Sequence, residues 1–341
     1  MKLIIQIPCY NEAGQLPETL AALPRHVEGF DCVEWLVIDD GSSDGTAEVA
    51  RAHGVDHIVR LPANQGLANA FMTGLDACLR QGADVIVNTD ADNQYDARCI
   101  PDLTAPVLDG RAQIVIGARP IDDIAHFSAL KRRLQKAGSA VVRLASGVAV
   151  ADAPSGFRAI HRDAAVRLHV FNRHTYTLET IIQAGHLGIT VLSVPVTVNP
   201  PTRESRLIRS VAQYVLRSGL TIFRIFVLYR PFRFFALVAL LLALPGVIAF
   251  GRFVTFYLLG DGDGRVQSLV IGSALLSMAA VAFVGGLLAD LTAANRKLLT
   301  EMLARQFERD LREAALERDG ANAQPAPARQ TPTPRKAATP R

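Results

Sequence analysis

The sequence predicts an α/β protein with a mostly parallel sheet and helices on both faces, followed by an amphipathic interfacial helix and a two-helix transmembrane hairpin. Short β-rich runs alternate with helical patterns over residues 1–120, and such alternation is typical of a parallel sheet. Three of these runs end in polar, acidic turns, which is where open α/β sheets bind ligands. Farther along the chain, two apolar segments are each long enough to cross a bilayer.

The expected elements of the first domain, residues 1–205, follow the hydrophobic pattern. Strands are expected at 3–7, 34–38, 57–61, 84–88, 113–117 and 190–198. Helices are expected at about 14–23, 44–53, 66–81, 97–108, 128–146 and 176–186. Asp44 lies at the start of the second helix, where an acidic residue is stabilised by the positive end of the helix dipole.

A basic amphipathic juxtamembrane helix is expected over residues 206–231. At 100° per residue its arginines fall on one face, and aliphatic and aromatic residues fall on the other. This arrangement suits a membrane interface, where the arginines meet anionic lipid. A soluble helix packed on the core is the alternative, which the following apolar segments disfavour.

The membrane region is expected at 232–290, with spans at about 234–259 and 266–288. The turn at 260–265 is short, so both outer ends lie on the same side of the bilayer. Basic residues flank those ends, whereas the turn carries one arginine. The positive-inside rule therefore predicts a multi-pass protein of the cell inner (cytoplasmic) membrane, with its first domain and C-terminus in the cytoplasm. A buried helical hairpin in a water-soluble protein is the alternative.

The rest of the chain offers fewer signals. Residues 291–318 are expected to form a charged helix, and the proline-rich residues 319–341 a disordered tail. A net charge of +4, from 36 basic and 32 acidic residues, is too small to indicate nucleic acid binding. The four cysteines show no metal-ligand spacing and no pairing pattern, so buried reduced thiols are expected. The N-terminal apolar run is too short for a signal peptide.

The most informative polar stretch is T-D-A-D-N-Q at 89–94, directly after an apolar strand. It places the carboxylates of Asp90 and Asp92 two residues apart and adds the amide of Gln94. Such hard oxygen ligands suit Mg²⁺ or Mn²⁺, which keep open positions for phosphate oxygens. An isolated D-x-D is more often a solvated acidic turn. Here two further polar turns follow other strands, P-C-Y-N-E at 8–12 and D-D-G-S-S-D-G-T at 39–46.

Together these three motifs resemble those of glycosyltransferase family 2, which has the GT-A fold, and its polyisoprenyl-phosphate branch related to dolichol-phosphate mannose synthase. The resemblance covers about 1–206 by motif and 207–290 by architecture. It implies that five residues bind the nucleotide-sugar: Pro8, Tyr10, Glu12, Asp40 and Asp90. It also implies that Asp90, Asp92 and Gln94 hold Mg²⁺ or Mn²⁺ on the diphosphate, where a Lewis acid assists departure of the nucleoside diphosphate. A turn at 64–66 resembles the family's N-x-G turn.

The resemblance assigns the acceptor side to cations. Arg119 matches a strand-end arginine of the branch, and Arg132 lies in a segment that resembles its R-R-L helix. Arg203 and Arg206 match the first and last positions of the family's R-x-S-K acceptor loop, with Arg206 in place of the lysine. Lys136 stands where the branch often has serine, which departs from the pattern. Asp92 and these four arginines are the candidate catalytic residues. The S-G-F-R segment at 155–158 and Glu179 also match family positions and are expected to shape the pocket.

The resemblance therefore implies a membrane-bound, inverting hexosyltransferase that moves one sugar from a UDP- or GDP-linked donor to a polyprenyl phosphate. Its product would be a polyprenyl-phosphate monosaccharide for cell-envelope glycan or glycosylation pathways. Membrane lipid is an expected partner, and analogy with small two-span enzymes suggests a homo-oligomer. The alternatives are a family 2 enzyme with another lipid or glycan acceptor, a processive synthase, and an inactive nucleotide-binding scaffold. The only tryptophan is Trp35, so the Q-x-x-R-W motif of processive synthases is absent.

Overall fold

The computed structural model describes residues 1–120, 146–170, 176–200, 229–260 and 266–323, with a few further residues between 138 and 143 and between 219 and 227. Side chains of the last helix are described as far as Glu313. Most of the helix expected at 128–146, most of the amphipathic helix expected at 206–231 and most of the tail expected at 319–341 lie outside the described residues.

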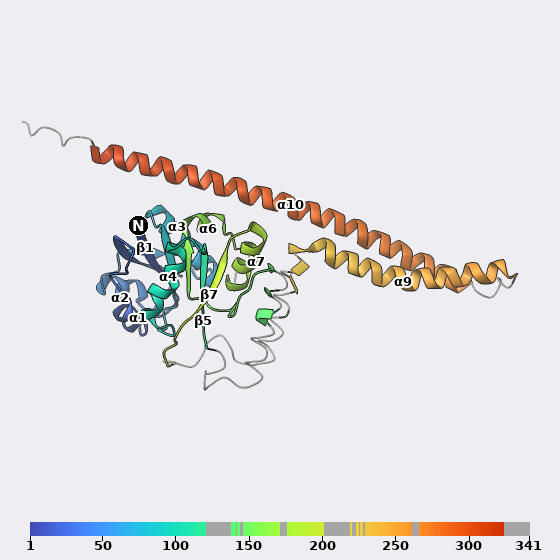
Figure 1. The fold of residues 1–341 in the computed structure, drawn as a ribbon, viewed down its shortest axis with the longest axis horizontal. Helices are drawn as coiled ribbons and strands as arrows, with labels where there is room; N and C mark the ends of the chain where they lie inside the picture. The colour runs from blue at the N-terminus through green and yellow to red at the C-terminus, as the bar shows by residue number, and fades with distance from the viewer. Residues whose placement is uncertain are drawn as a thin grey trace, which may run out of the picture.

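A seven-stranded sheet with the order β3-β2-β1-β4-β6-β5-β7 forms the centre of the first domain (Figure 1). Its strands are β1 (Lys2–Cys9), β2 (Cys32–Asp39), β3 (His57–Arg60), β4 (Val85–Asn88), β5 (Ile114–Ala118), β6 (Arg158–His161) and β7 (Val191–Pro195). All pairings are parallel except those of β6, which is antiparallel to β4 and β5. The predicted mostly parallel sheet is confirmed, but β6 was not predicted from the sequence.

Helices cover both faces of this sheet, as predicted. They are α1 (Leu16–Ala22), α2 (Thr46–Ala52), α3 (Leu67–Arg80), α4 (Ile100–Leu108, after the 3₁₀ turn Ala97–Cys99), α6 (Arg162–Arg167) and α7 (Thr177–Leu187). Along β1, Leu3 and Ile5 join the core beneath α1 and α4, whereas Ile4 joins the core beneath α3 and α7. Because both faces are buried, the central strands are apolar runs rather than alternating sequences.

Two long apolar helices, α9 (Pro231–Leu258) and α10 (Val266–Ala323), pack as an antiparallel hairpin. Glycines allow their close approach, because a Cβ added at Gly272 would lie 2.8 Å from the Phe250 backbone nitrogen and one at Gly286 would lie 2.8 Å from Phe235 Cβ. Only 11% and 17% of their most apolar windows are buried. By length and composition, each helix is able to cross a membrane.

Helix α10 is a single continuous helix that joins the second apolar segment to the charged segment expected at 291–318. No glycine or proline occurs between Gly286 and Gly320, so the sequence contains no helix breaker there. Its distal part runs back along the first domain (Figure 1), where Ala304 and Leu311 are buried in the same core cluster as α3 and α6. The helix therefore connects the apolar hairpin directly to the sheet domain.

Candidate functional site

The turns that follow β1 and β2 are joined by hydrogen bonds from backbone nitrogens to side-chain hydroxyls. Asn11 N donates to Ser42 Oγ at 2.9 Å, and Glu12 N donates to Thr46 Oγ1 at 3.0 Å. Asn11 has a positive φ of 53°, which turns the chain sharply after the strand. These contacts fix the P-C-Y-N-E turn against the D-D-G-S turn, so the structure brings together the first two predicted motifs.

Asp40 is almost fully buried, at 2% exposure, and holds the turn after β3 in place. Its carboxylate accepts hydrogen bonds from Gln65 N at 2.7 Å and from Gly66 N at 2.9 Å. The neighbouring Gly41 has φ +70°, and a Cβ there would lie 2.5 Å from the Ala63 carbonyl carbon. Asp40 thus positions the N-x-G turn predicted at 64–66 beside the first two motifs. Pro8 is buried in β1, whereas Tyr10 is 46% exposed.

The D-x-D segment follows β4 and is fixed by two neighbouring parts of the chain, α1 and the residues after β7. Thr19 Oγ1 of α1 donates to Ala91 O at 2.7 Å, and Asn199 N donates to Gln94 O at 2.9 Å. Within the segment, Gln94 N donates to Asp92 Oδ1 at 3.2 Å, and Asn93 adopts a φ of 53°. Asp92 and Gln94 are therefore held on a rigid, partly exposed turn.

Asp90 packs against the backbone of Gly156, just before β6. A Cβ at Gly156 would lie 3.1 Å from Asp90 Oδ1 and 2.9 Å from the Tyr176 hydroxyl oxygen. The Gly156 backbone is itself held from both sides: its nitrogen donates to the Tyr95 hydroxyl at 3.0 Å, and its carbonyl accepts from Asn88 Nδ2 at 2.8 Å. The segment that leads into the unpredicted strand β6 therefore forms the wall against which Asp90 is placed.

The pKa of Asp90 is raised to about 7: burial and the nearby carboxylates of Asp92 and Glu12 raise it, whereas the cations Arg119 and Arg158 oppose the rise. The two adjacent carboxylates repel one another, and a divalent cation would relieve that repulsion. The oxygen donors of Asp90, Asp92 and Gln94 therefore fit a divalent cation whose coordination is completed by ligand oxygens.

Arg119 is held by a buried carboxylate. Its Nε and Nη2 lie 2.7 and 3.1 Å from the two oxygens of Asp152, which is 0% exposed, and its backbone nitrogen also donates to Asp152. The Arg119 side chain is 10% exposed. The pKa of Arg119 is raised: burial lowers it, but Tyr95, Asp152 and Asp90 outweigh that effect. The sequence did not identify Asp152 as the partner of this predicted site residue.

Arg158 is a second buried cation near Asp90, at 1% exposure. It donates to the carbonyls of Ser155, Ala153 and Thr177 at 2.9 to 3.0 Å, and to Thr180 Oγ1 at 2.6 Å. Burial lowers its pKa. The sequence predicted only that the 155–158 segment shapes the pocket. The signal available for a distinct role of Arg158 was a charged residue beside the apolar residues Phe157, Ala159 and Ile160. Of the other predicted site residues, Arg132, Arg203 and Arg206 lie outside the described residues, as does Lys136.

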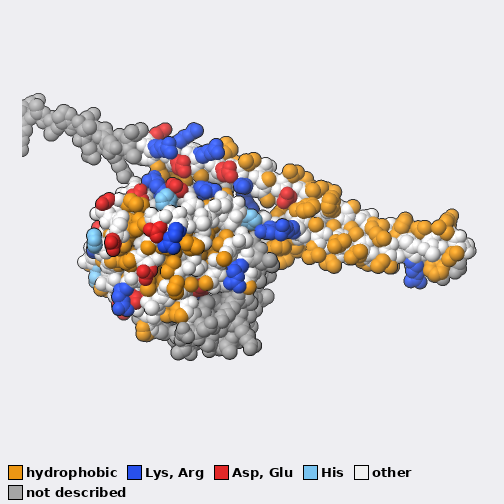
Figure 2. Space-filling model, viewed as in Figure 1, with side chains coloured by type: hydrophobic (Ala, Val, Ile, Leu, Met, Phe, Trp, Pro, Cys, Tyr) orange, Lys and Arg blue, Asp and Glu red, His pale blue; other side chains and the backbone are white. Residues whose placement is uncertain are grey.

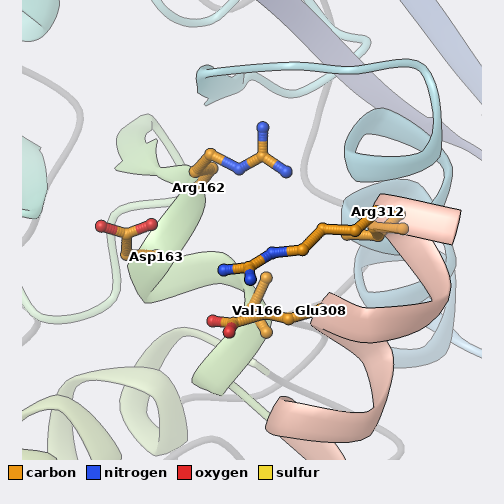
Figure 3. Close-up of a pocket in the computed structure, with 6 residues that line it drawn as sticks. Arg162, Asp163, Val166, Glu308 and Arg312 are labelled. Atoms are coloured by element: carbon orange, nitrogen blue, oxygen red, sulfur yellow. The ribbon is translucent and has the colours of Figure 1, made fainter. Parts of the chain in front are cut away.

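A cavity of about 370 Å³ lies elsewhere, between α6 and α10 (Figure 3). Arg312 extends from α10 toward α6, where Arg162 and Asp163 lie, and Glu308 lies below it (Figure 3). Arg162 N donates to the carbonyl of Asp84, the residue that precedes β4, so this cavity is at the opposite end of the sheet from Asp90. Its mixed charges do not resemble a diphosphate site.

Comparison with known proteins relates this chain to glycosyltransferases. The glycosyl transferase family 2 model matches residues 4–168. An undecaprenyl-phosphate mannosyltransferase from Micrococcus luteus is 30% identical over 207 residues, covering 58% of this chain and 83% of the relative. A polyprenol monophosphomannose synthase from Mycolicibacterium smegmatis is 28% identical, covering 58% and 77%.

Among solved structures, the fold is similar to glucosyl-3-phosphoglycerate synthase from Mycobacterium tuberculosis in complex with Mn²⁺, UDP-glucose and phosphoglyceric acid. The TM-score is 0.51 at 19% identity, covering 65% of this chain and 79% of that one. At this identity the likeness concerns the fold, and it confirms the GT-A architecture predicted from the motifs. The chain thus belongs to glycosyl transferase family 2, within its polyisoprenyl-phosphate branch, and is a hexosyltransferase.

Proposed function

We propose that this protein is a membrane-bound, inverting glycosyltransferase that moves one sugar from a nucleotide-sugar to a polyprenyl phosphate at the cytoplasmic face of the membrane. The observation that carries the proposal is the Asp90–Asp92 pair at the end of β4. Because β4 and β2 both pair in parallel with β1, the three family motifs follow neighbouring strands at one edge of the sheet. The names of the relatives from Micrococcus luteus and Mycolicibacterium smegmatis support polyprenyl phosphate as the acceptor.

The donor would bind where the three turns meet. Pro8, Tyr10 and Glu12 would contact its nucleoside, and Asp40 would act by holding the turn at 64–66 beside it. Asp90, Asp92 and Gln94 would hold a divalent cation, and Mn²⁺ in the structural relative supports this assignment. When bound, such a cation neutralises the diphosphate and assists its departure as the bond to the sugar breaks.

The acceptor needs positioning rather than activation. A phosphate monoester is already an oxyanion near neutral pH, so no strong general base is required. Arg119 would bind one of its oxygens, since the contacts with Asp152 use Nε and Nη2, and Nη1 has no hydrogen bond among the described residues. Arg132, Arg203 and Arg206 would supply the remaining charge-assisted contacts, as the family resemblance implies.

The two apolar helices would anchor the enzyme in the membrane that contains its lipid acceptor. Basic residues at the outer ends of the hairpin favour a cytoplasmic domain and C-terminus. Reporters fused at each terminus should behave as cytoplasmic, and a tag in the turn at 260–265 should be accessible from the other side. A C-terminus on the far side would contradict the two-span arrangement.

A processive synthase is disfavoured by the surroundings of the only tryptophan. Trp35 lies in β2 at 7% exposure, its indole nitrogen donates to the Pro24 carbonyl, and the Arg25 guanidinium stacks on its ring. It is therefore a core residue held by its own contacts. An inactive scaffold is tested by calorimetric titration of nucleotide with and without Mn²⁺, combined with a turnover assay.

The main test is a screen of radiolabelled nucleotide-sugars, both UDP- and GDP-linked, with purified protein, Mn²⁺ and undecaprenyl phosphate. We expect one donor to yield a labelled lipid that mild acid hydrolyses to a monosaccharide. Transfer of label to a polysaccharide, or to an acceptor without a phosphate, would contradict the proposal.

A further inference from the structure

The sheet domain meets the apolar hairpin at a group of residues that we call the junction cluster: His186, Tyr229, Arg230, Arg233, Arg296 and Lys297. Tyr229, just before α9, lies between the two parts. Its ring stacks on His186 of α7, with 5.3 Å between centroids, and the Arg296 guanidinium carbon lies 4.8 Å from the same ring. The cluster is therefore a packed contact between the catalytic domain and the membrane hairpin.

Positive charge accumulates at this contact. Arg230 and Arg233 lie at the N-terminus of α9, where the helix dipole already disfavours cations. Lys297 lies on α10, and among the described residues no carboxylate forms an ion pair with it or with those two arginines. Arg233 and Lys297 are exposed. Figure 2 shows blue side chains gathered where the two helices leave the globular part.

Two buried nitrogens at the junction also have no hydrogen-bond partner within the described structure, Arg230 Nε and His186 Nε2. Burying such groups without a partner is costly. Burial lowers the pKa of His186, and Arg230, Arg296 and Lys297 lower it further, so the field at this point is positive. The Tyr229 hydroxyl donates to the buried carboxylate of Glu179 at 3.5 Å, but among the described residues no anion forms a hydrogen bond with Arg230 Nε or His186 Nε2.

We propose that the junction cluster binds the phosphate of an anionic membrane phospholipid. The cluster lies where the apolar length of α9 begins, which is the level of the head groups if the hairpin spans a bilayer. A phospholipid phosphate here would neutralise the cations at the helix N-terminus. It would also fix the catalytic domain relative to the membrane.

A phosphate bound at the junction cluster is not an acceptor in position to react. Tyr176, at the start of α7, contacts Asn88 and Gly156 beside Asp90. His186 is ten residues farther along, about 15 Å away at the rise of an α-helix. A phosphate held by the junction cluster is thus too far from the donor site to attack the sugar. The proposal goes beyond the glycosyltransferase function and stands independently of it.

The test measures binding of phosphatidylglycerol to the full-length protein in detergent, by native mass spectrometry and by the rise in thermal midpoint. Phosphatidylcholine serves as the zwitterionic reference. The double variant Arg233→Gln/Lys297→Gln removes two exposed charges, so its fold should persist. Each basic residue contributes a factor of about five to the affinity, so we expect the affinity of the double variant for phosphatidylglycerol to fall about 25-fold. Donor binding should be unchanged, which separates this result from failure of the glycosyltransferase proposal.

A matched control is Arg305→Gln/Arg309→Gln, which removes two exposed charges from the same helix beyond the junction. It should bind phosphatidylglycerol like the wild type. Equal losses in the two double variants would overturn the proposal, because they would indicate a general charge effect. It would also be overturned if only undecaprenyl phosphate, and not phosphatidylglycerol, bound at the cluster.

Discussion

A methyl group added at Gly156 should disturb the proposed metal site directly. In Gly156→Ala the new Cβ would lie 3.1 and 3.2 Å from the two oxygens of Asp90 and 2.9 Å from the Tyr176 hydroxyl oxygen. The Tyr176 ring is stacked on Phe71 at 3.8 Å between centroids, so it cannot move away freely. The strain should therefore move the Asp90 carboxylate, which lies at the more open side of the contact.

The magnitude follows from these distances. Overpacking of this kind costs about 1–3 kcal/mol of stability. A misplacement approaching 1 Å in an active site lowers turnover by up to about a hundredfold, so we expect a loss of roughly ten- to a hundredfold. The apparent Mn²⁺ requirement should rise at the same time, because Asp90 is the group displaced.

The assay is transfer of labelled sugar to undecaprenyl phosphate over a Mn²⁺ titration, with folding followed by circular dichroism. Gly14→Ala is the matched control, since a Cβ there would meet nothing within 4 Å and the residue does not have a positive φ. It should retain wild-type turnover. A folded Gly156→Ala protein with normal turnover and a normal Mn²⁺ titration would refute the placement of Asp90 in the metal site.

Three further predictions address charge, acceptor and packing. Because the pKa of Asp90 is raised from 3.8 to about 7, the folded protein binds more protons than the unfolded chain between these pH values. In thermal melts, the stability of the metal-free protein should therefore fall from pH 4 to 7, and the stabilisation by Mn²⁺ should increase as pH rises. Asp90→Asn should flatten both trends and raise the Mn²⁺ concentration required for activity. Arg203→Ala should lower the rate with a short soluble prenyl phosphate about ten- to a hundredfold while donor binding persists, and a normal rate would reassign Arg203 to membrane docking. Leu311→Ala, which truncates a side chain of α10 that is 9% exposed, should cost about 2–3 kcal/mol in the melting of the sheet domain, whereas an unchanged melt would mean that α10 does not dock there.

The arrangement of the strand-end motifs was predictable because it depends on local pattern. Apolar runs followed by acidic turns identified β1, β2 and β4, and parallel strands place their carboxyl ends together. The structure adds that Asp40 acts on the turn at 64–66 through two hydrogen bonds, a contact between residues 25 and 26 positions apart that no local pattern reveals.

The parts that were missed depend on long-range contacts. Strand β6 has only four residues and begins with Arg158, so neither its length nor its pattern indicates a strand. The pairing of Arg119 with Asp152 joins residues 33 positions apart. The charged helix expected at 291–318 continues the second apolar segment within α10, because no glycine or proline occurs between residues 287 and 319.

The most direct test of the account is the turnover of Asp92→Ala, compared with the wild type, with the cognate nucleotide-sugar and undecaprenyl phosphate. Asp92 lies on a partly exposed turn outside the core, so the variant should remain folded. We expect transfer to be abolished at every Mn²⁺ concentration, because a proposed metal ligand has been removed. Retained transfer with wild-type metal dependence would contradict the claim that the Asp90–Asp92 pair performs metal-assisted glycosyl transfer.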